Sequence, residues 1–371
     1  MMRLLMALTG AVAALLVACG GSSGGDGNEP IALLQTEVDD GFERPREVPD
    51  FRFPRDHGAH PGFQSEWWYV TGNLTGEGRS FGYQLTIFRF GLAPEGPVAA
   101  GSWATRQLWL AQLAVTDLGG DQFLTAERIS RGALDLAGAR DDRLAVHVED
   151  FVIEATDSGL ESVQLRALDR GFGIDLQLSA VKPIVRQGNQ GLSAKGPTPG
   201  NASYYYSVPR WETTGSVRVG DRDHDVTGLS WFDREWSTSA LEGNQSGWDW
   251  FALHLDDGTD LMYYGLREES GGFGPYSAGV LVAADGAVRK LSATDLAAHP
   301  LDWWESPVTG RTYPIAWRLE GTDLALEVRA KYAAQEHRGR FHYWEGAVDV
   351  TGTRDGRPVA GSGYLEMTGY Q

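Results

Sequence analysis

The segment at residues 231–237 places two carboxyl groups among aromatic side chains. Asp233 and Glu235 are two residues apart, and Trp231 and Trp236 flank them. Side chains alternate between the two faces of a strand, so Asp233 and Glu235 are expected on the same face. A carboxyl group shielded by aromatic rings can have a raised pKa and act as a general acid, and two carboxyl groups on one face can share a proton. We therefore predict that Asp233 and Glu235 are catalytic and that Trp231 lines their site.

The chemistry that suits such an acid is the addition of water to an isolated alkene. The double bond is protonated to a tertiary carbocation, water captures the cation, and aromatic faces stabilise it. A structural alternative stays open, in which Asp233 or Glu235 pairs with an arginine elsewhere in the chain, such as Arg210, and remains ionised.

A third acidic candidate, Glu66, precedes Trp68 in an aromatic run. A carboxylate in such surroundings must find a partner or face water. Glu66 either lines a ligand site together with Trp68 and Tyr83, or forms a salt bridge with Arg89 or Arg234 that closes the end of a barrel.

Other patterns of catalysis are missing from the sequence. It contains no Gly-x-Ser-x-Gly elbow, no His-x-x-x-His or His-Glu-x-x-His zinc spacing, and no glycine-rich loop of the phosphate-binding form. His57 and His60 are three residues apart, but they belong to a region without strand periodicity. We therefore predict no metal site and no cofactor.

Most of the chain after residue 66 alternates apolar and polar residues with a period of two, which is typical of half-buried strands. Turn-forming residues separate these runs at intervals of about ten residues, and this pattern predicts an all-β sandwich or barrel. Residues 292–299 are expected to form one short helix. Residues 183–202 are rich in Gly and Pro and form either a lid or a surface loop.

Two aromatic hairpins in the two halves of the chain resemble each other. Trp68 and Tyr69 in the first are matched by Trp250 and Phe251 in the second, and each hairpin returns after a glycine-containing turn. The repeat suggests duplication of one β-domain, although any two tryptophan-rich hairpins share such features. The domain boundary is expected in the Ser-, Gly-, Asn- and Gln-rich stretch at residues 237–246.

The N-terminus is similar to an export signal that ends in a lipid-attachment site. A positive start is followed by an apolar core too short to span a bilayer, and then by Leu-Val-Ala before Cys19. This segment resembles the lipobox of bacterial lipoproteins; an ordinary signal peptide with a chance cysteine is the alternative. We expect a signal peptide at residues 1–18, a flexible tether and lead-in at 19–58, and β-domains at 59–240 and 241–371.

The composition is acidic, with 50 Asp and Glu against 32 Lys and Arg and a net charge of −18. Such a surface repels phosphate backbones, so nucleic acid is excluded as a partner, and it resists lying flat on anionic lipid. Cys19 is the only cysteine, so the sequence allows no internal disulfide and stability must come from the core. The thirteen tryptophans could line a cavity for an apolar ligand.

Four segments in order carry a family resemblance: residues 60–69, 204–210, 228–237 and 304–314. Together they resemble the AttH-like group of lipocalin-like proteins, which is related to the carotenoid 1,2-hydratases (hydroxyneurosporene synthases). The resemblance extends from about His60 to the end of the chain. It implies two consecutive lipocalin-like antiparallel β-barrel domains.

The resemblance also implies roles for single residues. Asp233 matches the carboxylic acid that is regarded as the proton donor of the hydratases, and Trp231 matches an aromatic residue two positions earlier. Tyr204 and Tyr206 fall near a histidine and a tryptophan that shape the substrate site. The two charged residues that follow Asp233 depart from the smaller polar pattern of the hydratases. Members of the AttH-like group are also labelled predicted secreted hydrolases.

Three functions fit these observations, and enzyme and carrier are not separated by the sequence. The first is a lipoprotein, anchored through Cys19 at the periplasmic face of the bacterial envelope, that binds or carries a lipid or isoprenoid in a β-barrel cavity. Gly20 favours the outer membrane of a Gram-negative host, and the resemblance implies ABC transporter components as partners. The second is a hydratase or hydrolase that uses Asp233 as general acid. The third is a docking module whose barrels are filled by their own side chains.

Overall fold

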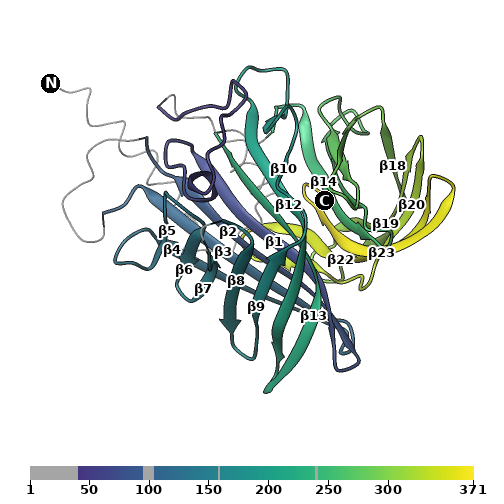
Figure 1. Ribbon diagram of the computed structural model, residues 1–371, viewed down its shortest axis with the longest axis horizontal. Coiled ribbons are helices and arrows are strands. Elements are labelled where there is room, and N and C mark those ends of the chain that lie inside the picture. Colours follow the sequence, from purple (N-terminus) through teal and green to yellow (C-terminus); the bar gives the residue numbers. More distant parts are fainter. Residues whose placement is uncertain (1–40, 95–103, 158, 239–240) are drawn as a thin grey trace.

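The chain folds into two curled antiparallel β-sheets that lie side by side (Figure 1). The computed structural model describes residues 41–94, 104–157, 159–238 and 241–371. The expected signal peptide, Cys19 and the first part of the tether lie outside these residues. Strands dominate the described regions, and a short 3₁₀ turn, η2 (Arg55–His57), precedes the first of them. The all-β prediction is therefore confirmed.

The first sheet consists of β1 (Ser65–Gly76), β2 (Arg79–Gly91), β3 (Gln107–Asp117), β4 (Gln122–Arg131), β5 (Ala137–Ala139), β6 (Ala145–Val148), β7 (Phe151–Ala155), β8 (Ser162–Asp169), β9 (Phe172–Ala180), β10 (Val185–Arg186), β11 (Leu192–Ala194), β12 (Ala202–Val219) and β13 (Arg222–Ser237). Its order is β4-β3-β2-β1-β13-β12-β9-β8-β7-β6-β5, and β10 and β11 both pair with β12. The first and last strands of this sheet therefore meet at its centre, where β1 pairs with β13.

The second sheet consists of β14 (Gln245–Leu255), β15 (Asp260–Glu268), β16 (Ala278–Val282), β17 (Val288–Ser292), β18 (Leu296–Glu305), β19 (Thr312–Gly321), β20 (Leu324–Ala330), β21 (Glu336–Arg338), β22 (His342–Arg354) and β23 (Arg357–Met367). Its order is β17-β16-β15-β14-β23-β22-β20-β19-β18, and β21 pairs with β22. The first sheet ends at residue 237 and the second begins at residue 245.

The prediction of a short helix at residues 292–299 is wrong. The backbone N–H of Ser292 donates to Asp295 Oδ2 over 2.8 Å and its hydroxyl donates to the same oxygen over 2.6 Å, which closes a turn. Strand β18 then begins at Leu296, whose cross-strand partner is Gly321. Hydrogen bonds from Ser and Asp side chains to the nearby backbone favour a turn over a helix. Pairing with β19 then holds residues 296–299 in an extended strand.

Each sheet curls around an apolar core of its own. One cluster fills the inside of the first sheet, with Trp68, Trp109 and Trp211 among its largest members, and a second fills the inside of the other sheet around Trp317 and Trp344. Burial of these side chains is the main source of stability, at about 1.5–3 kcal/mol for each large apolar residue.

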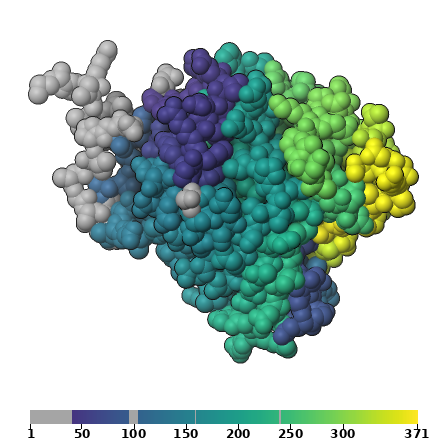
Figure 2. Space-filling view, viewed as in Figure 1, coloured from purple at the N-terminus to yellow at the C-terminus, as the bar shows by residue number. Residues whose placement is uncertain are grey.

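A third apolar cluster lies between the two sheets and joins them. It contains Tyr69, Tyr205 and Trp231 from the first sheet, and Trp250 and Tyr264 are among the residues of the second sheet. The space-filling view shows the green and yellow second half seated against one side of the teal first half (Figure 2). The sheets therefore pack through the faces that point away from their own cores.

The two matched hairpins are present, but the matched tryptophans of their first strands pack on different sides of their sheets. Trp68 belongs to the core of the first sheet, whereas its sequence match Trp250 belongs to the cluster between the sheets. Tyr69, the next residue of β1, belongs to the same cluster as Trp250. A shift of one residue moves a side chain to the opposite face of a strand, so the match of Trp68 with Trp250 is wrong.

A buried ion-pair cluster also ties the two sheets together. Asp260 on β15 contacts Arg210 Nη2 on β12 and Lys182 Nζ, each over 2.7 Å, and Asp260 is fully buried. Both cations also donate to backbone carbonyls of the second sheet.

Replacing Asp260 with asparagine should lower the free energy of unfolding by about 2–3 kcal/mol, because two charge-assisted bonds weaken while carbonyls still accept from both cations. Equilibrium urea unfolding measures this loss. Asp257→Asn on the same hairpin is the matched control, since Asp257 pairs with Arg354 near the surface and should change stability by less than about 1 kcal/mol. Equal losses in both variants would contradict the prediction.

Candidate functional site

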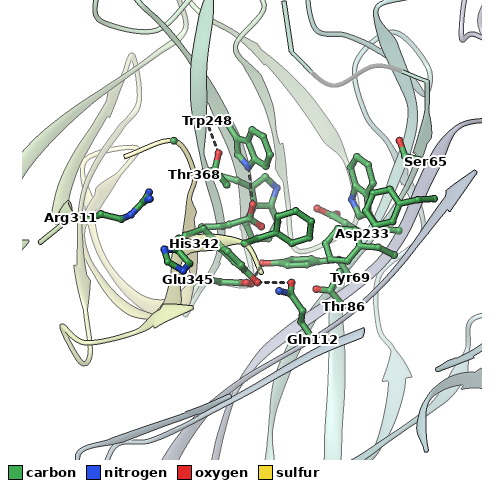
Figure 3. A pocket seen from close by; sticks show the side chains of 18 residues that line it. Ser65, Tyr69, Thr86, Gln112, Asp233, Trp248, Arg311, His342, Glu345 and Thr368 are labelled. Atoms are coloured by element: carbon green, nitrogen blue, oxygen red, sulfur yellow. Dashed lines mark hydrogen bonds between the residues drawn. The ribbon is translucent and has the colours of Figure 1, made fainter. Parts of the chain in front are cut away.

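A cavity of about 170 Å³ lies between the two sheets. Its wall is mostly aromatic, with Trp67, Tyr69, Phe88, Phe90, Trp248, Trp250 and Tyr343 contributing side chains. Three carboxyl groups, those of Asp233, Glu345 and Glu366, also line it. Figure 3 shows Asp233 and Glu345 on different sides of this space, with Tyr69 between them. An apolar cavity with a few convergent polar groups is the usual form of a small-molecule site.

Strand register places these polar residues in two facing rows. On the first sheet Tyr69 of β1 is the direct cross-strand partner of Asp233 on β13. On the second sheet Glu345 of β22 is the direct partner of Glu366 on β23, and Glu366 is in turn paired with Trp250 of β14. Directly opposite residues point to the same face of a sheet, so each row presents its side chains to the other sheet.

Asp233 is held by three hydrogen-bond donors. The Tyr205 hydroxyl donates to Oδ2 over 2.5 Å, and the Ser207 hydroxyl and the Trp231 Nε1–H donate to Oδ1 over 2.5 and 2.7 Å. The Trp250 Nε1–H in turn donates to the Tyr205 hydroxyl over 3.3 Å, which links this network to the second sheet. The carboxyl group is therefore fixed in one orientation at the cavity wall.

Burial raises the pKa of Asp233 to about 7, because the apolar surroundings disfavour the charged form, and the three donors keep the pKa from rising further. The same donors stabilise the carboxylate that remains after the proton leaves. An acid that is protonated near neutral pH, and whose conjugate base is already solvated by the protein, is suited to general-acid catalysis.

The two glutamates of the second sheet differ from each other. Glu366 is half-buried, and its Oε1 accepts a hydrogen bond from the Trp248 Nε1–H over 2.8 Å. Burial and, to a lesser extent, the nearby Asp233 raise the pKa of Glu366 to about 7. Glu345 is almost completely buried, and burial together with Glu366 raises the pKa of Glu345 well above its usual value. Glu345 therefore resists ionisation more strongly than an exposed glutamate does.

Glu345 connects the two sheets through its first oxygen. The Tyr69 hydroxyl donates to Glu345 Oε1 over 2.5 Å, and next to it the Tyr343 hydroxyl donates to Gln112 Oε1 over 3.0 Å. Glu345 Oε2 lies 3.9 Å from His337 Nε2, and within the described residues neither atom has a hydrogen-bond partner. Burial lowers the pKa of His337 to about 3, so its imidazole is neutral and places no positive charge beside Glu345.

Unfolding should depend on pH in a direction that reports the raised pKa of Asp233. The carboxyl pKa is 3.8 in the reference state and about 7 in the folded protein. The native state therefore binds the proton more tightly than the unfolded chain, and stability is full below pH 3.8 and decreases as the pH rises to about 7. The contribution of Asp233 is on the order of 4 kcal/mol. Urea unfolding at several pH values should show a shallower decrease in Asp233→Asn, and an unchanged slope would contradict the raised pKa.

Of the predicted catalytic pair, only Asp233 reaches the cavity. Glu235 does lie on the same face of β13, as the alternation predicts, but its Oε1 is 3.3 Å from Lys195 Nζ. Lys195 also lies over the rings of Tyr205 and Tyr264. Glu235 is thus held in an ion pair beside the site, while Arg210, the arginine considered for it, is bound to Asp260.

For Glu66 the salt bridge is confirmed. Its carboxylate accepts hydrogen bonds from Arg89 Nε and from Arg234 Nη2, and all three side chains are buried inside the first sheet. The backbone N–H of His60 also donates to both carboxylate oxygens, over 3.1 and 3.0 Å. Arg234 donates further to the carbonyl of Gly58 over 2.5 Å. This cluster fastens the lead-in loop to the sheet and has no access to the cavity.

None of the other predicted ligand-binding residues lines the cavity, although Trp231 lies in the cluster between the sheets and donates to Asp233. Trp68 and Tyr206 belong to the core of the first sheet, and the Tyr206 hydroxyl lies 2.6 Å from His57 Nδ1. The Tyr83 hydroxyl lies 2.6 Å from Ser230 Oγ in the same core. Tyr204 packs edge-on against Trp236 near the lead-in. These residues fill the inside of the first sheet, where a ligand cavity was expected; the cavity that contains Asp233 lies between the sheets instead.

Sequence reasoning missed Glu345 and Glu366 and did not assign Tyr69 to the site. The sequence does contain a sign of these two site residues, because Glu366 interrupts an otherwise apolar stretch of β23 and Glu345 follows Trp344 in β22. Nothing in the alternation, however, shows that these faces meet Asp233.

Two searches were negative within the described residues. No group of three or more His, Cys, Asp or Glu side chains in these ranges is arranged to hold a metal ion. None of the helices found in the same ranges has the length and hydropathy needed to cross a membrane.

Fold and site define a two-domain, lipocalin-like all-β protein with an aromatic, carboxyl-lined cavity at the domain interface. The AttH-like family model matches residues 44–370, so the chain belongs to the AttH-like family. Among curated proteins, none matches this sequence.

Solved structures agree with this assignment. The chain is similar to a Nitrosomonas europaea protein assigned to AttH, with 34% identity and a TM-score of 0.79 over 89% of this chain and 100% of the other. The fold is also similar to kievitone hydratase from Nectria haematococca, with 16% identity and a TM-score of 0.67 over 90% and 98% of the two chains. A third similar fold is that of CghA in complex with Sch210972, with 13% identity and a TM-score of 0.53 over 90% and 97%.

Proposed function

We propose that this protein is a hydratase-type enzyme that protonates an alkene of a hydrophobic substrate in the cavity between its two sheets. The observation that carries the proposal is Asp233, a carboxyl group with a pKa of about 7 in an aromatic cavity and with three donors ready to stabilise its conjugate base. The chemistry needs only side chains and water.

The cavity supports each step of such a reaction. Its aromatic wall accommodates an apolar chain, and the faces of Trp67, Trp248 and Trp250 stabilise positive charge on carbon. Asp233 transfers its proton to one alkene carbon, a new C–H bond forms, and the adjacent carbon becomes a carbocation. Water then attacks this carbon and loses a proton, which gives a tertiary alcohol.

Two comparisons support the proposal. The similarity to kievitone hydratase shows that an enzyme named for hydration uses this fold. The match of Asp233 with the carboxylic acid regarded as the hydratases' proton donor, which the family resemblance implies, also supports the proposal. We further propose an isoprenoid or other lipid as the substrate, and anchoring at the periplasmic face of the envelope through Cys19.

A carrier function is the second candidate, and the apolar lining of the cavity is the observation that favours it. A carrier needs the aromatic wall but not a proton donor. The raised pKa of Asp233 therefore has no role in it.

Turnover distinguishes the two candidates. The full chain is incubated with geraniol, a linear isoprenoid with isolated double bonds, in water labelled with heavy oxygen. Mass spectrometry should detect a tertiary alcohol that contains the label. Absence of any labelled alcohol from geraniol and from longer isoprenoid alcohols, together with an apolar molecule retained in extracts of the purified protein, would overturn the hydratase in favour of the carrier.

A further inference from the structure

Glu366 is a second carboxyl group of the cavity, and the protonation of the alkene by Asp233 does not use it. It comes from β23, more than a hundred residues after Asp233, and lines the same cavity from the opposite sheet. Its Oε1 accepts from Trp248, and among the described residues no hydrogen bond reaches its Oε2. One carboxylate oxygen is thus available to a bound water or substrate.

Glu345 does not fill the same role, although it is the cross-strand partner of Glu366. Its Oε1 is engaged by Tyr69, and its side chain is almost completely buried. Burial and the neighbouring carboxyl raise the pKa of Glu345 well above its usual value. A carboxyl group that resists ionisation is a poor proton acceptor, so Glu345 positions Tyr69 and Glu366 is left as the acceptor.

Asp233 and Glu366 also influence each other electrostatically. Two carboxyl groups that line one low-dielectric cavity do not readily ionise together, and the nearby Asp233 contributes to the raised pKa of Glu366. Because the pKa of each carboxyl group is about 7, the two groups together hold on average one proton near neutral pH. Such a pair contains an acid and a base at the same time.

We propose that Glu366 is the general base of the reaction and forms with Asp233 an acid–base pair across the cavity. The inference rests on the proposed function. Asp233 gives its proton to the alkene carbon and becomes a carboxylate. The oxygen of water forms the C–O bond, and the water proton passes to Glu366. One water has then been added across the double bond, and transfer of the proton from Glu366 to Asp233 through solvent restores the starting state.

The remaining charged groups around the pair do not replace either partner. Glu235 on β13 and Lys195, in the loop between β11 and β12, form an ion pair beside Asp233, so their charges compensate. Tyr205 and Tyr69 are buried, and their pKa values are raised well above 10, so both stay neutral. Tyr343 on β22 is also buried, its pKa is raised well above 10, and it therefore stays neutral as well. Arg311 and His342 also line the cavity.

Infrared titration of the full chain tests whether the two groups share a proton. The carboxylic acid C=O band is followed from acidic to basic pH in wild type, Asp233→Asn, Glu366→Gln and the exposed control Glu320→Gln. In Asp233→Asn the midpoint of Glu366 should shift down by about one pH unit, and in Glu366→Gln that of Asp233 should do the same. Midpoints that match those of wild type in both variants would overturn the shared proton.

Kinetics test the role of base. With geraniol as the probe, the rate should rise to a maximum near pH 7 and fall on both sides, since Glu366 must be ionised and Asp233 protonated. Glu366→Gln should lower the rate by about 10²-fold or more and remove the acidic limb of the profile. A Glu366→Gln enzyme that keeps the acidic limb would overturn the assignment. A wild-type protein without any hydration would instead overturn the proposed function, and the infrared titration would still decide the pair.

Discussion

Replacing Asp233 with asparagine should lower the rate of hydration by about 10²- to 10⁴-fold while the fold is retained. An amide cannot donate an acidic proton to carbon. Its oxygen can still accept from Ser207 and Trp231, so the side chain should keep its orientation. The rate with geraniol, measured on protein checked by circular dichroism, gives the result.

Asp223→Asn is the matched control for this variant. It makes the same substitution on the same strand, β13, but Asp223 is exposed and forms a surface ion pair with Arg218. Its rate should equal that of wild type. If Asp233→Asn keeps its rate as well, Asp233 is not the acid. If Asp233→Asn loses turnover but still binds the apolar ligand, acid catalysis and binding are separated, as the proposed function requires.

Replacing Glu66 with glutamine should lower the free energy of unfolding by about 3–5 kcal/mol, because Arg89 and Arg234 would be left as buried cations without a counter-ion. Equilibrium urea unfolding measures the loss. Glu154→Gln is the matched control: its partner Arg143 is at 2.9 Å and both side chains are more than a third exposed. The control should change stability by less than about 1 kcal/mol.

The same variant separates the salt bridge from a catalytic role. Glu66 has no access to the cavity, so folded Glu66→Gln protein should hydrate geraniol at the wild-type rate. A loss of activity without a loss of stability would contradict the structural assignment.

Glu66 and Asp233 show how surroundings give one type of group opposite behaviour. Two arginines hold the pKa of Glu66 well below its usual value despite complete burial, so Glu66 stabilises the fold above its unfolded pKa and this stability is lost as the pH falls. Asp233 has hydrogen-bond donors but, among the residues that the structure describes, no salt-bridge partner, and its pKa rises. Its contribution to stability is therefore lost in the opposite direction, as the pH increases.

The sequence by itself determined the fold class and the faces of individual strands. Period-two alternation identified an all-β chain, and it placed Asp233 and Glu235 on one face of β13, as the structure shows. These features depend on the geometry of a single strand, which local sequence fixes. The family resemblance likewise depended on short segments that can be recognised without a structure.

Only the tertiary structure decided what each face meets. Glu66 and Asp233 both lie among tryptophans in the sequence, yet Glu66 points into the first sheet toward two arginines and Asp233 points toward the second sheet. The cavity, and the pairing of Asp233 with Glu366, arise where two sheets pack through their outer faces. Alternation specifies which side chains share a face, but the surface that covers this face comes from residues far along the chain, and that choice is made by packing.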